Sequence, residues 1–289
     1  MATPAPTNRI AFQGEYGANS DMACRDMYPD LEPHPCRTFE DAFNAVSEGE
    51  TDLAMIPIEN TIAGRVADIH HILPESHLYI VGEYFMPIHF QLMARPGTRL
   101  ADIRSVQSHI HALGQCRRII REHGWEPKVS SDTAGAAREV AEHDDRTMAA
   151  ISPELAADLY GLEIIGRDIE DAEENVTRFV ILSREPSGVG PSAEADLPVI
   201  TTFVFSVRNL PAALYKAMGG FATNGVNMTK LESYQLEGRF TATQFYADIE
   251  GHPDEPPVAR ALEELQFFST KVRILGAYPS HPFRVQQER

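Results

Sequence analysis

The stretch TMAAISPELAADLYGLEII (147–165) carries the local pattern from which the fold can be predicted. Its first apolar run predicts a buried strand. Ser152, Pro153 and Gly161 then suit a helix cap, a first helical residue and the residue after a helix end. We therefore predict a strand that leads directly into a helix, followed by a second short apolar strand.

The same order occurs earlier in the chain. SVQSHIHALGQCRRIIREHG (105–124) and KVSSDTAGAAREVAEH (128–143) each read as a strand followed by a helix. TFEDAFNAVSEGE (38–50) reads as a helix with Thr38 as its cap and Gly49 at its end. Strands that alternate with helices of about ten residues predict an α/β fold with a largely parallel sheet.

The pattern changes at SREPSGVGPSAEADLP (183–198), which is rich in Pro, Gly and Ser and predicts a linker. Beyond it, the segment 199–279 predicts the order β-α-β-β-α-β. This is the ferredoxin-like order. A module of this small size carries regulation or association more often than chemistry.

Composition restricts the classes of function. The 289 residues suffice for two domains, and the net charge of −17 disfavours nucleic acid and anionic membranes as partners. Three scattered cysteines without a C-x-x-C argue against a disulfide framework and a zinc site. The sequence has no long apolar run and no secretory signal, so we expect a reduced, cytoplasmic protein.

Four polar clusters follow predicted strands, and each alone is equally typical of an ordinary turn or surface loop. Together they favour one cleft that binds a small anionic ligand, because ligands of open α/β sheets bind at strand ends. The clusters are GEYGANSD (14–21), PIENTIAG (57–64), SHIHALGQC (108–116) and NVTRF (175–179).

Two of these clusters allow a more specific expectation. Ser108 lies where a strand becomes a helix and is a candidate cap, with Gln115 two helical turns later. Strict alternation along NVTRF would point Thr177 to one side of the sheet and Arg178 to the other. Whether Arg178 faces the cleft stays open at this point.

The clusters, in this order, resemble those of monofunctional bacterial prephenate dehydratase with a C-terminal ACT domain. The resemblance covers nearly the whole chain. Its motifs are AFQGEYGANS (11–20), IPIENTIAGRV (56–66), SHIHALGQC, DTAGAA (132–137), NVTRFVIL (175–182), GVNMTKLES (225–233) and YADIEGH (246–252).

The resemblance implies a domain organisation. The catalytic domain would be 1–184, a two-lobed α/β region like a type II periplasmic binding protein. Its lobes would be about 8–85 with 165–184, and 86–164. A linker (185–198), a ferredoxin-like ACT regulatory domain (199–280) and a tail (281–289) would follow.

The resemblance also implies the reaction, the loss of CO₂ and water from prephenate to give phenylpyruvate, with no metal and no organic cofactor. Aromatisation drives this reaction, so the enzyme has to help hydroxide leave. The implied catalytic residues are Thr177, Asn60, Ser108 and Gln115. The implied substrate-binding residues are Arg178, Phe179, Glu59, Thr61 and His109.

An allosteric site for L-phenylalanine and a homodimer or homotetramer are implied as well. The allosteric residues would be Ala212, Ala213, Leu214, Asn224, Val226, Asn227, Glu232 and Ser233. This chain departs from the family at several positions. Thr61 stands where Ser is usual, Ile110 and His111 replace Pro and Gln, Ala212 replaces Gly, and Tyr234 replaces Arg. The catalytic set is complete, whereas the regulatory site is altered.

Two alternatives remain at the level of sequence. Arogenate dehydratase performs the same chemistry on the amino analogue, and Glu59 is a candidate partner for an ammonium group. A catalytically dead amino-acid-sensing binding protein is the second alternative. The presence of Thr177 and the lack of an export signal argue against it.

Overall fold

The computed structural model describes residues 6–172, 174–191, 198–208, 210–235 and 242–287, so residues 192–197 of the predicted linker lie outside it. The chain forms two compact units. Unit 1 comprises Met1–Val66 with Phe85–Phe179, and unit 2 comprises Ala67–Tyr84 with Val180–Arg289. Each unit is therefore built from two separate segments of the chain.

The first sheet has the strand order β2-β1-β3-β11-β5, with the short strand β4 beside β3. Strand β1 runs parallel to both β2 and β3. Within β5 and β11 the chain passes from one unit to the other. The strands are β1 (Arg9–Gln13), β2 (Glu32–Cys36), β3 (Leu53–Asn60), β4 (Gly64–Arg65), β5 (Tyr79–Pro87) and β11 (Val176–Ser183), and the first helices are α1 (Asn19–Met27) and α2 (Phe39–Glu48).

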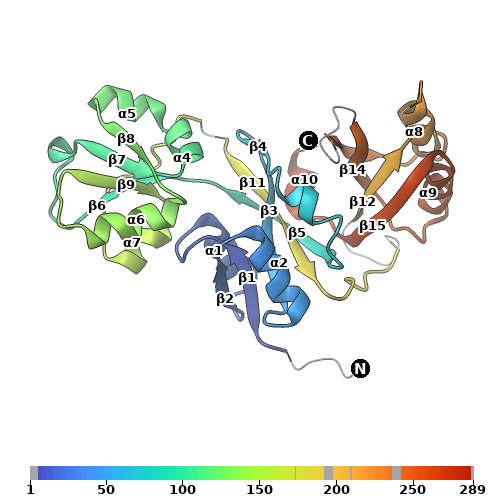
Figure 1. Cartoon of the computed structure of the whole chain (residues 1–289), viewed down its shortest axis with the longest axis horizontal. Helices are drawn as coiled ribbons and strands as arrows, with labels where there is room; N and C mark the ends of the chain where they lie inside the picture. The colour runs from blue at the N-terminus through green and yellow to red at the C-terminus, as the bar shows by residue number, and fades with distance from the viewer. Residues whose placement is uncertain (1–5, 173, 192–197, 209, 236–241, 288–289) are drawn as a thin grey trace. The chain divides into compact units, whose positions relative to one another are not determined.

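The second sheet of unit 1 has the order β10-β6-β9-β7-β8. Figure 1 shows β6 to β9 in green among helices α4 to α7. Its strands are β6 (Gln91–Ala94), β7 (Ser105–Ser108), β8 (Glu126–Val129), β9 (Met148–Ser152) and β10 (Glu163–Gly166). The helices are α4 (Ile110–Gln115), α5 (Arg117–His123), α6 (Thr133–Glu142) and α7 (Glu154–Tyr160), and a 3₁₀ turn spans Leu100–Asp102.

The prediction of a largely parallel sheet is confirmed only in part. Strands β7, β8 and β9 are parallel, but β6 is antiparallel to β9 and β10 is antiparallel to β6. Strand β6 enters this sheet after β5, and β10 precedes the segment that leads back to β11. The antiparallel strands are thus those at which the chain arrives from the first sheet and leaves for it.

Local signals place most helix ends correctly. Thr38 caps α2 through a reciprocal capping box with Asp41, and Gly49 closes the helix in a left-handed conformation. The prediction that Ser152 caps α7 is wrong. Ser152 is the last residue of β9, and Pro153 occupies the cap position without a side-chain cap hydrogen bond.

In unit 2, the C-terminal segment forms a sheet in the order β13-β14-β12-β15. The paired strands of this sheet are antiparallel. The elements confirm the predicted β-α-β-β-α-β order. They are β12 (Val199–Val207), α8 (Ala213–Thr223), β13 (Met228–Gln235), β14 (Ala242–Glu250), α9 (Pro256–Phe268) and β15 (Ser269–Pro279).

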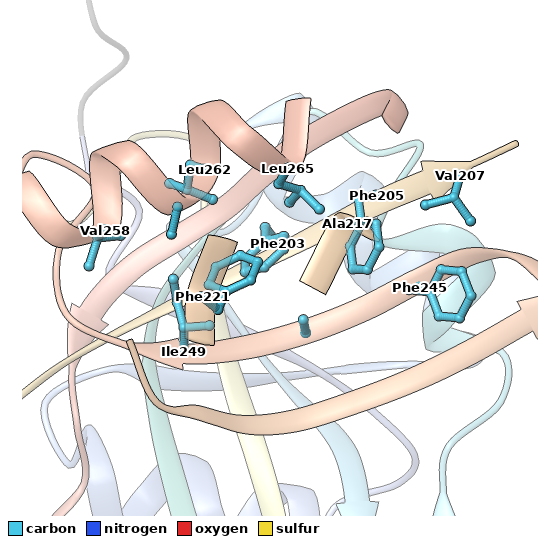
Figure 2. Packing of buried hydrophobic residues seen from close by; sticks show 12 residues of the cluster. Phe203, Phe205, Val207, Ala217, Phe221, Phe245, Ile249, Val258, Leu262 and Leu265 are labelled. Atoms are coloured by element: carbon cyan, nitrogen blue, oxygen red, sulfur yellow. The ribbon is translucent and has the colours of Figure 1, made fainter. Parts of the chain in front are cut away.

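One face of this sheet packs on α8 and α9. Figure 2 shows Phe203 and Phe205 of β12 between the helices and the neighbouring strand β14. Phe203 stacks on Phe221 of α8 with the ring centroids 5.8 Å apart. This apolar layer holds the module together, because fully burying an aromatic or branched side chain stabilises by about 1.5–3 kcal/mol.

The segment 67–84, which contains α3 (Ile69–Ile72), belongs to the same unit. Arg284 of α10 (Pro282–Gln287) binds the buried carboxylate of Glu83 through two hydrogen bonds of 2.7 and 2.8 Å. A Cβ on Gly276 of β15 would collide with the carbonyl oxygen of Ile80. The backbones approach so closely there that only glycine fits. Among the described residues, no helix has both the length and the apolar character required to cross a membrane.

Candidate functional site

The site begins where two neighbouring strands bring Asn60 and Thr177 together. Asn60 ends β3 and Thr177 lies at the start of β11, and these strands are adjacent in the sheet. The Asn60 Nδ2 atom donates to Thr177 Oγ1 over 2.9 Å. The Asn60 Oδ1 atom accepts from the backbone N–H groups of Ile62 and Ala63. These contacts hold the amide in one orientation, with its donor directed at the hydroxyl.

The Thr177 hydroxyl is left with a hydrogen to donate. Its oxygen accepts from Asn60, and among the described residues it donates no hydrogen bond. The side chain is half-buried at the strand end. A ligand oxygen can therefore receive this hydrogen.

Asn175 connects this pair to Gln115, and the sequence analysis did not name it as a site residue. Its Oδ1 accepts from Asn60 Nδ2 at 2.7 Å, and its Nδ2 donates to Gln115 Oε1 at 2.9 Å. Asn175 is buried. The signal was its place in the motif NVTRF, but spacing alone does not reveal that it bridges two distant segments.

Gln115 lies at the end of α4, beside the second sheet. Its backbone oxygen accepts from Asp171 N over 2.7 Å, which ties the helix end to the segment leading into β11. Hydrogen bonds thus run from Gln115 through Asn175 and Asn60 to Thr177. Three of the four predicted catalytic residues are brought together in this way.

Ser108 is placed differently from the expectation. It is the last residue of β7, its side chain is fully buried, and its hydroxyl donates to Ile151 O of the neighbouring strand over 2.5 Å. The prediction that Ser108 caps the next helix is wrong, because its hydroxyl binds a strand carbonyl and His109 is the cap. Within the described parts of the chain, Ser108 has no hydrogen bond to the other three candidates.

His109 caps α4 with its Nδ1, which accepts from His111 N over 3.4 Å. Burial lowers the pKa of His109. The nearby His111 lowers it further, and Asp132 opposes these two effects. The imidazole is therefore neutral at pH 7 and can offer its second nitrogen as a donor.

Arg178 is almost fully buried and forms an ion pair with Glu59, with a distance of 3.0 Å between Nη1 and Oε1. Its guanidinium also lies over the ring of Phe85, 5.9 Å from the centroid. Thr177 and Arg178 have different surroundings, as strand alternation predicts.

Thr61 and Phe179, two other predicted substrate-binding residues, both lie at or near the start of β11. Thr61 accepts from Val176 N and donates to Glu174 O, so it fastens the corner after β3 to the start of β11. Phe179 lies inside the strand where β11 enters the core and is only 1% exposed. Its role in substrate binding stays a prediction.

In the glycine turn of the first cluster (14–21), a carboxylate of the chain itself accepts a backbone hydrogen bond. Gly17 N donates to Asp21 Oδ2 over 2.8 Å, and Asp21 is fully buried beside Arg25. A carboxylate of the chain thus occupies the turn that the sequence offered as a possible anion site.

A pocket of about 780 Å³ lies next to Gln115. Its remaining lining comes from the corner after β3 and from α4, α5 and β8. Apolar side chains predominate: Ile62, Ala63, Ile110, Leu113, Ile120, Trp125, Pro127 and Val129.

One group of possible metal ligands occurs among the described residues: His89, Asp168 and Glu170, with ligand atoms within 4.8 Å of one another. His89 Nδ1 already lies 2.7 Å from Glu170 Oε1, whose other oxygen accepts from Phe90 N. These groups satisfy one another, and they lie on the segments that join the two sheets.

The predicted allosteric residues form separate groups. Ala212 precedes α8 and has a positive φ of 59°, whereas Asn224 ends the same helix. The Asn224 side chain donates to Gly220 O and accepts from Arg260 Nε. On β13, Glu232 pairs with Lys230 over 2.7 Å, and Tyr234 shares a hydrogen bond of 2.9 Å with His70.

Comparisons with known proteins agree with this arrangement. The family model described as prephenate dehydratase matches residues 10–187. A bifunctional N-acyl-homoserine lactone acylase/prephenate dehydratase of Komagataeibacter europaeus is 52% identical, covering 95% of this chain and 97% of the relative. Arogenate dehydratase/prephenate dehydratase 2 of Arabidopsis thaliana is 37% identical, over 94% of this chain and 72% of the relative.

Solved structures resemble the chain over the same length. A prephenate dehydratase of Arthrobacter aurescens in complex with L-Phe has a TM-score of 0.84 at 35% identity, covering 94% of this chain and 89% of that one. A structure described as a novel type of quorum quenching acylase has a TM-score of 0.87 at 52% identity, covering 95% of this chain and 99% of that one.

Proposed function

This chain belongs to the prephenate dehydratase family, and from that premise we propose that Thr177, held by Asn60, protonates the hydroxyl that leaves the substrate. The enzyme converts prephenate to phenylpyruvate, CO₂ and water. The hydrogen bond of 2.9 Å from Asn60 to Thr177 is the observation that supports this proposal.

The chemistry requires one proton at one oxygen. As the bond from C4 to its oxygen breaks, the bond to the departing carboxylate breaks as well, and its electrons make the ring aromatic. The leaving hydroxide takes the Thr177 proton and becomes water, and the solvent returns a proton to Thr177 through a neighbouring polar group. A threonine hydroxyl is a weak acid, far from the pKa that suits general acid catalysis.

Asn60 compensates for this weakness. Its amide donates to the oxygen that gains charge as Thr177 loses its proton, and such a fixed donor stabilises the charge without rearrangement. Asn175 and Gln115 keep Asn60 in place and tie it to the other sheet of unit 1. Gln115, Ser108, Thr61 and His109 would complete the polar surroundings of the substrate.

Replacement of Thr177 tests the proposal. We expect Thr177→Ala to lower kcat at least about 10²-fold with little change in KM, because the hydroxyl acts on the departing oxygen. Thr177→Ser keeps the hydroxyl and should retain most of kcat. Phenylpyruvate formation is followed by ultraviolet absorbance. An alanine variant with more than about a third of the wild-type kcat would exclude Thr177 as the proton donor.

Arogenate dehydratase is the alternative within the family. Arogenate carries an ammonium group where prephenate carries a ketone, so it requires a negative partner. Glu59, the candidate for this role, is paired with Arg178 over 3.0 Å. This pairing supports prephenate as the preferred substrate. Parallel measurements of kcat/KM for the two substrates decide between them.

Hydrolysis of N-acyl-homoserine lactones is a second candidate activity. The relative from K. europaeus is named for this activity as well as for dehydration. The apolar pocket beside Gln115 supports the idea, because a dianionic substrate such as prephenate makes no use of so apolar a lining. Release of homoserine lactone from an N-acyl substrate by the purified chain is the direct assay.

For the C-terminal segment we propose regulation. Residues 199–280 would be an ACT domain that binds L-phenylalanine, with the catalytic domain in 1–184 and a linker at 185–198. The bound L-Phe of the A. aurescens relative supports this assignment. Ala212 to Leu214 and Asn224 to Asn227 lie at opposite ends of α8, which at 11 residues is about 16 Å long. One amino acid reaches both groups only if they come from two chains, so we also propose a homodimer or homotetramer in the cytoplasm.

A further inference from the structure

The pocket beside Gln115 collects apolar side chains that are unusually exposed. Ile62, Ile110 and Val129 are 44%, 54% and 64% exposed, and all three line it. Its deeper residues Leu113, Ile120 and Trp125 are buried. Contiguous exposed apolar surface in a hollow marks a binding site more often than isolated apolar residues do.

Two arginines lie at the edge of this pocket. Arg117 and Arg121 are four residues apart on α5, so they share one helix face. Both are exposed, and neither has a carboxylate partner among the described residues. In a chain with a net charge of −17, two unpaired cations beside an apolar hollow are a specific arrangement. They complement a ligand that is apolar along its length and carries oxygen atoms at one end.

The pocket also adjoins the hydrogen-bonded residues of the active site. Gln115 belongs to both, and Ile62 and Ala63 donate their backbone N–H groups to Asn60 Oδ1. The other three predicted catalytic residues, Asn60, Ser108 and Thr177, do not line it. It is therefore a neighbouring compartment, and its volume of about 780 Å³ lies within the roughly 300–1,000 Å³ of small-molecule sites.

We propose that this pocket binds the acyl chain of a medium-length carboxylic acid or of its N-acyl amide, with Arg117 and Arg121 at the oxygen-bearing end. The inference rests on the second candidate activity only where the amide is concerned. Leu113, Ile120 and Trp125 would contact the chain, and Ile62, Ile110 and Val129 would cover it. The ligand would thereby remove the exposed apolar side chains from water.

Trp125 makes the proposal directly measurable, because it is the single tryptophan of the chain. It stacks on His123 with the ring centroids 4.5 Å apart. We expect decanoate to change the fluorescence of Trp125 on titration into the full chain, and butyrate to change it far less. Each buried methylene should tighten binding about threefold to fourfold until the pocket is full. No saturable change with decanoate at millimolar concentration would overturn the proposal.

Two matched variants distinguish binding in this pocket from non-specific binding elsewhere on the surface. Val129→Glu places a charge in the pocket at an exposed position, and decanoate affinity should fall more than about tenfold. Leu159→Glu changes an exposed leucine of α7 that does not line the pocket, and should leave the affinity unchanged. Equal affinities in these two variants would place the ligand elsewhere.

The arginines are tested in the same way. Arg117→Gln with Arg121→Gln should weaken decanoate at least about tenfold, because charge-assisted hydrogen bonds are lost. N-decanoyl homoserine lactone has no carboxylate and should lose less. Arg118→Gln removes one charge from the same helix outside the pocket lining and is the control. If decanoate is insensitive to both arginines, their assignment is wrong.

Separate measurements of decanoate binding and of enzyme activity distinguish this inference from the proposed functions. Prephenate turnover, measured on the same preparation, reports the dehydratase site. Decanoate binding without hydrolysis of the acyl lactone would support the pocket and contradict the acylase. Hydrolysis of the acyl lactone without any response of Trp125 would support the acylase activity and contradict binding in this pocket.

Discussion

Two consecutive positions on each of two neighbouring strands explain why the site holds its shape. Asn60 and Thr177 meet through a hydrogen bond, and their chain neighbours Glu59 and Arg178 meet through an ion pair. Because side chains alternate along a strand, the two pairs fasten β3 to β11 on opposite faces of the sheet. The second pair thereby supports the first. We assign Glu59 and Arg178 a positioning role, with Thr177 at the reacting atoms.

Arg178→Leu should therefore affect stability more than substrate affinity. The change breaks the ion pair between Arg178 and Glu59, and breaking a largely buried pair costs about 3–5 kcal/mol, somewhat less here because Glu59 is 31% exposed. We expect a clearly lower Tm with KM changed less than about threefold. A rise in KM of tenfold or more without a loss of Tm would show that Arg178 binds the substrate.

The double variant Glu59→Leu with Arg178→Leu is the control. It removes both charges of the ion pair together, so most of the lost stability should return. If the double variant is as unstable as Arg178→Leu alone, packing around the guanidinium, including its contact with Phe85, accounts for the loss.

At this scale the sequence predicted part of the site. Motif order identified Asn60, Gln115 and Thr177, and alternation separated Thr177 from Arg178. The role of Asn175 was missed, because its partners Asn60 and Gln115 lie 115 and 60 residues away. Ser108 was assigned as a cap because serine suits caps, but the carbonyl of Ile151 in the neighbouring strand takes its hydroxyl. Both cases depend on contacts between segments that no local pattern records.

At the scale of elements, the turn between β1 and α1 meets helices of the second sheet. Tyr160 of α7 donates its hydroxyl to Tyr16 O over 2.8 Å, and Arg138 of α6 binds Glu15 with an Nε–Oε2 distance of 2.7 Å. Gly17 lies between these contacts with a φ of +90°, and a Cβ there would be 2.9 Å from Ala156 Cα. Backbone meets backbone here, so neither side can yield by a side-chain rotation.

Gly17→Ala should consequently destabilise unit 1 by more than backbone strain alone. Gly161→Ala is the matched control, because Gly161 also has a positive φ of 67° but open space around its Cβ position. An alanine in that conformation costs about 1–2 kcal/mol. We expect Gly161→Ala to show that loss and Gly17→Ala at least about 2 kcal/mol more. Denaturant unfolding measures both, and equal losses would mean that the contact with α7 yields freely.

Elements were predictable where they begin and end on local signals. Thr38, Gly49 and Gly161 mark helix ends as expected, and the C-terminal order of strands and helices is confirmed. Strand β2 was missed because its sequence EPHPC contains two prolines, which suit only an edge strand such as this one. The antiparallel course of β6 and β10 depends on how the chain passes between sheets, which periodicity does not show.

At the scale of the whole chain, the segment 67–84 belongs with the C-terminal sheet. His70 shares a hydrogen bond with Tyr234, and Arg284 binds Glu83. Tyr234 stands where the family usually has arginine, and its hydroxyl meets His70 in unit 2. From the sequence, this substitution indicated only an altered regulatory site. The structure adds that the new side chain has a hydrogen-bond partner 164 residues earlier in the chain.

Ala212 lies in the altered regulatory motif and has a strained backbone conformation whose energetic cost can be measured. Its φ of 59° is a left-handed conformation, which costs alanine about 1–2 kcal/mol and glycine nearly nothing. Ala212→Gly should therefore raise the free energy of unfolding by up to about 1 kcal/mol, less than the full strain because glycine also makes the unfolded chain more flexible. Ala259→Gly, an exposed alanine within α9, should lower it by about 0.5–1 kcal/mol.

The same variant tests regulation. Without the Cβ of Ala212, the backbone before α8 is open to an amino acid, so Ala212→Gly should bind L-phenylalanine more tightly than the wild-type chain in calorimetry, while Ala259→Gly should not. Inhibition of prephenate turnover should shift to lower phenylalanine concentrations in parallel, because coupling between the two sites is reciprocal.

Light scattering should find at least a dimer in the phenylalanine-saturated protein, since the two ends of α8 are too far apart to hold one ligand within a chain. A monomer that binds phenylalanine would refute the shared site, and no heat from either form at millimolar phenylalanine would show that Tyr234 and the other substitutions have removed it.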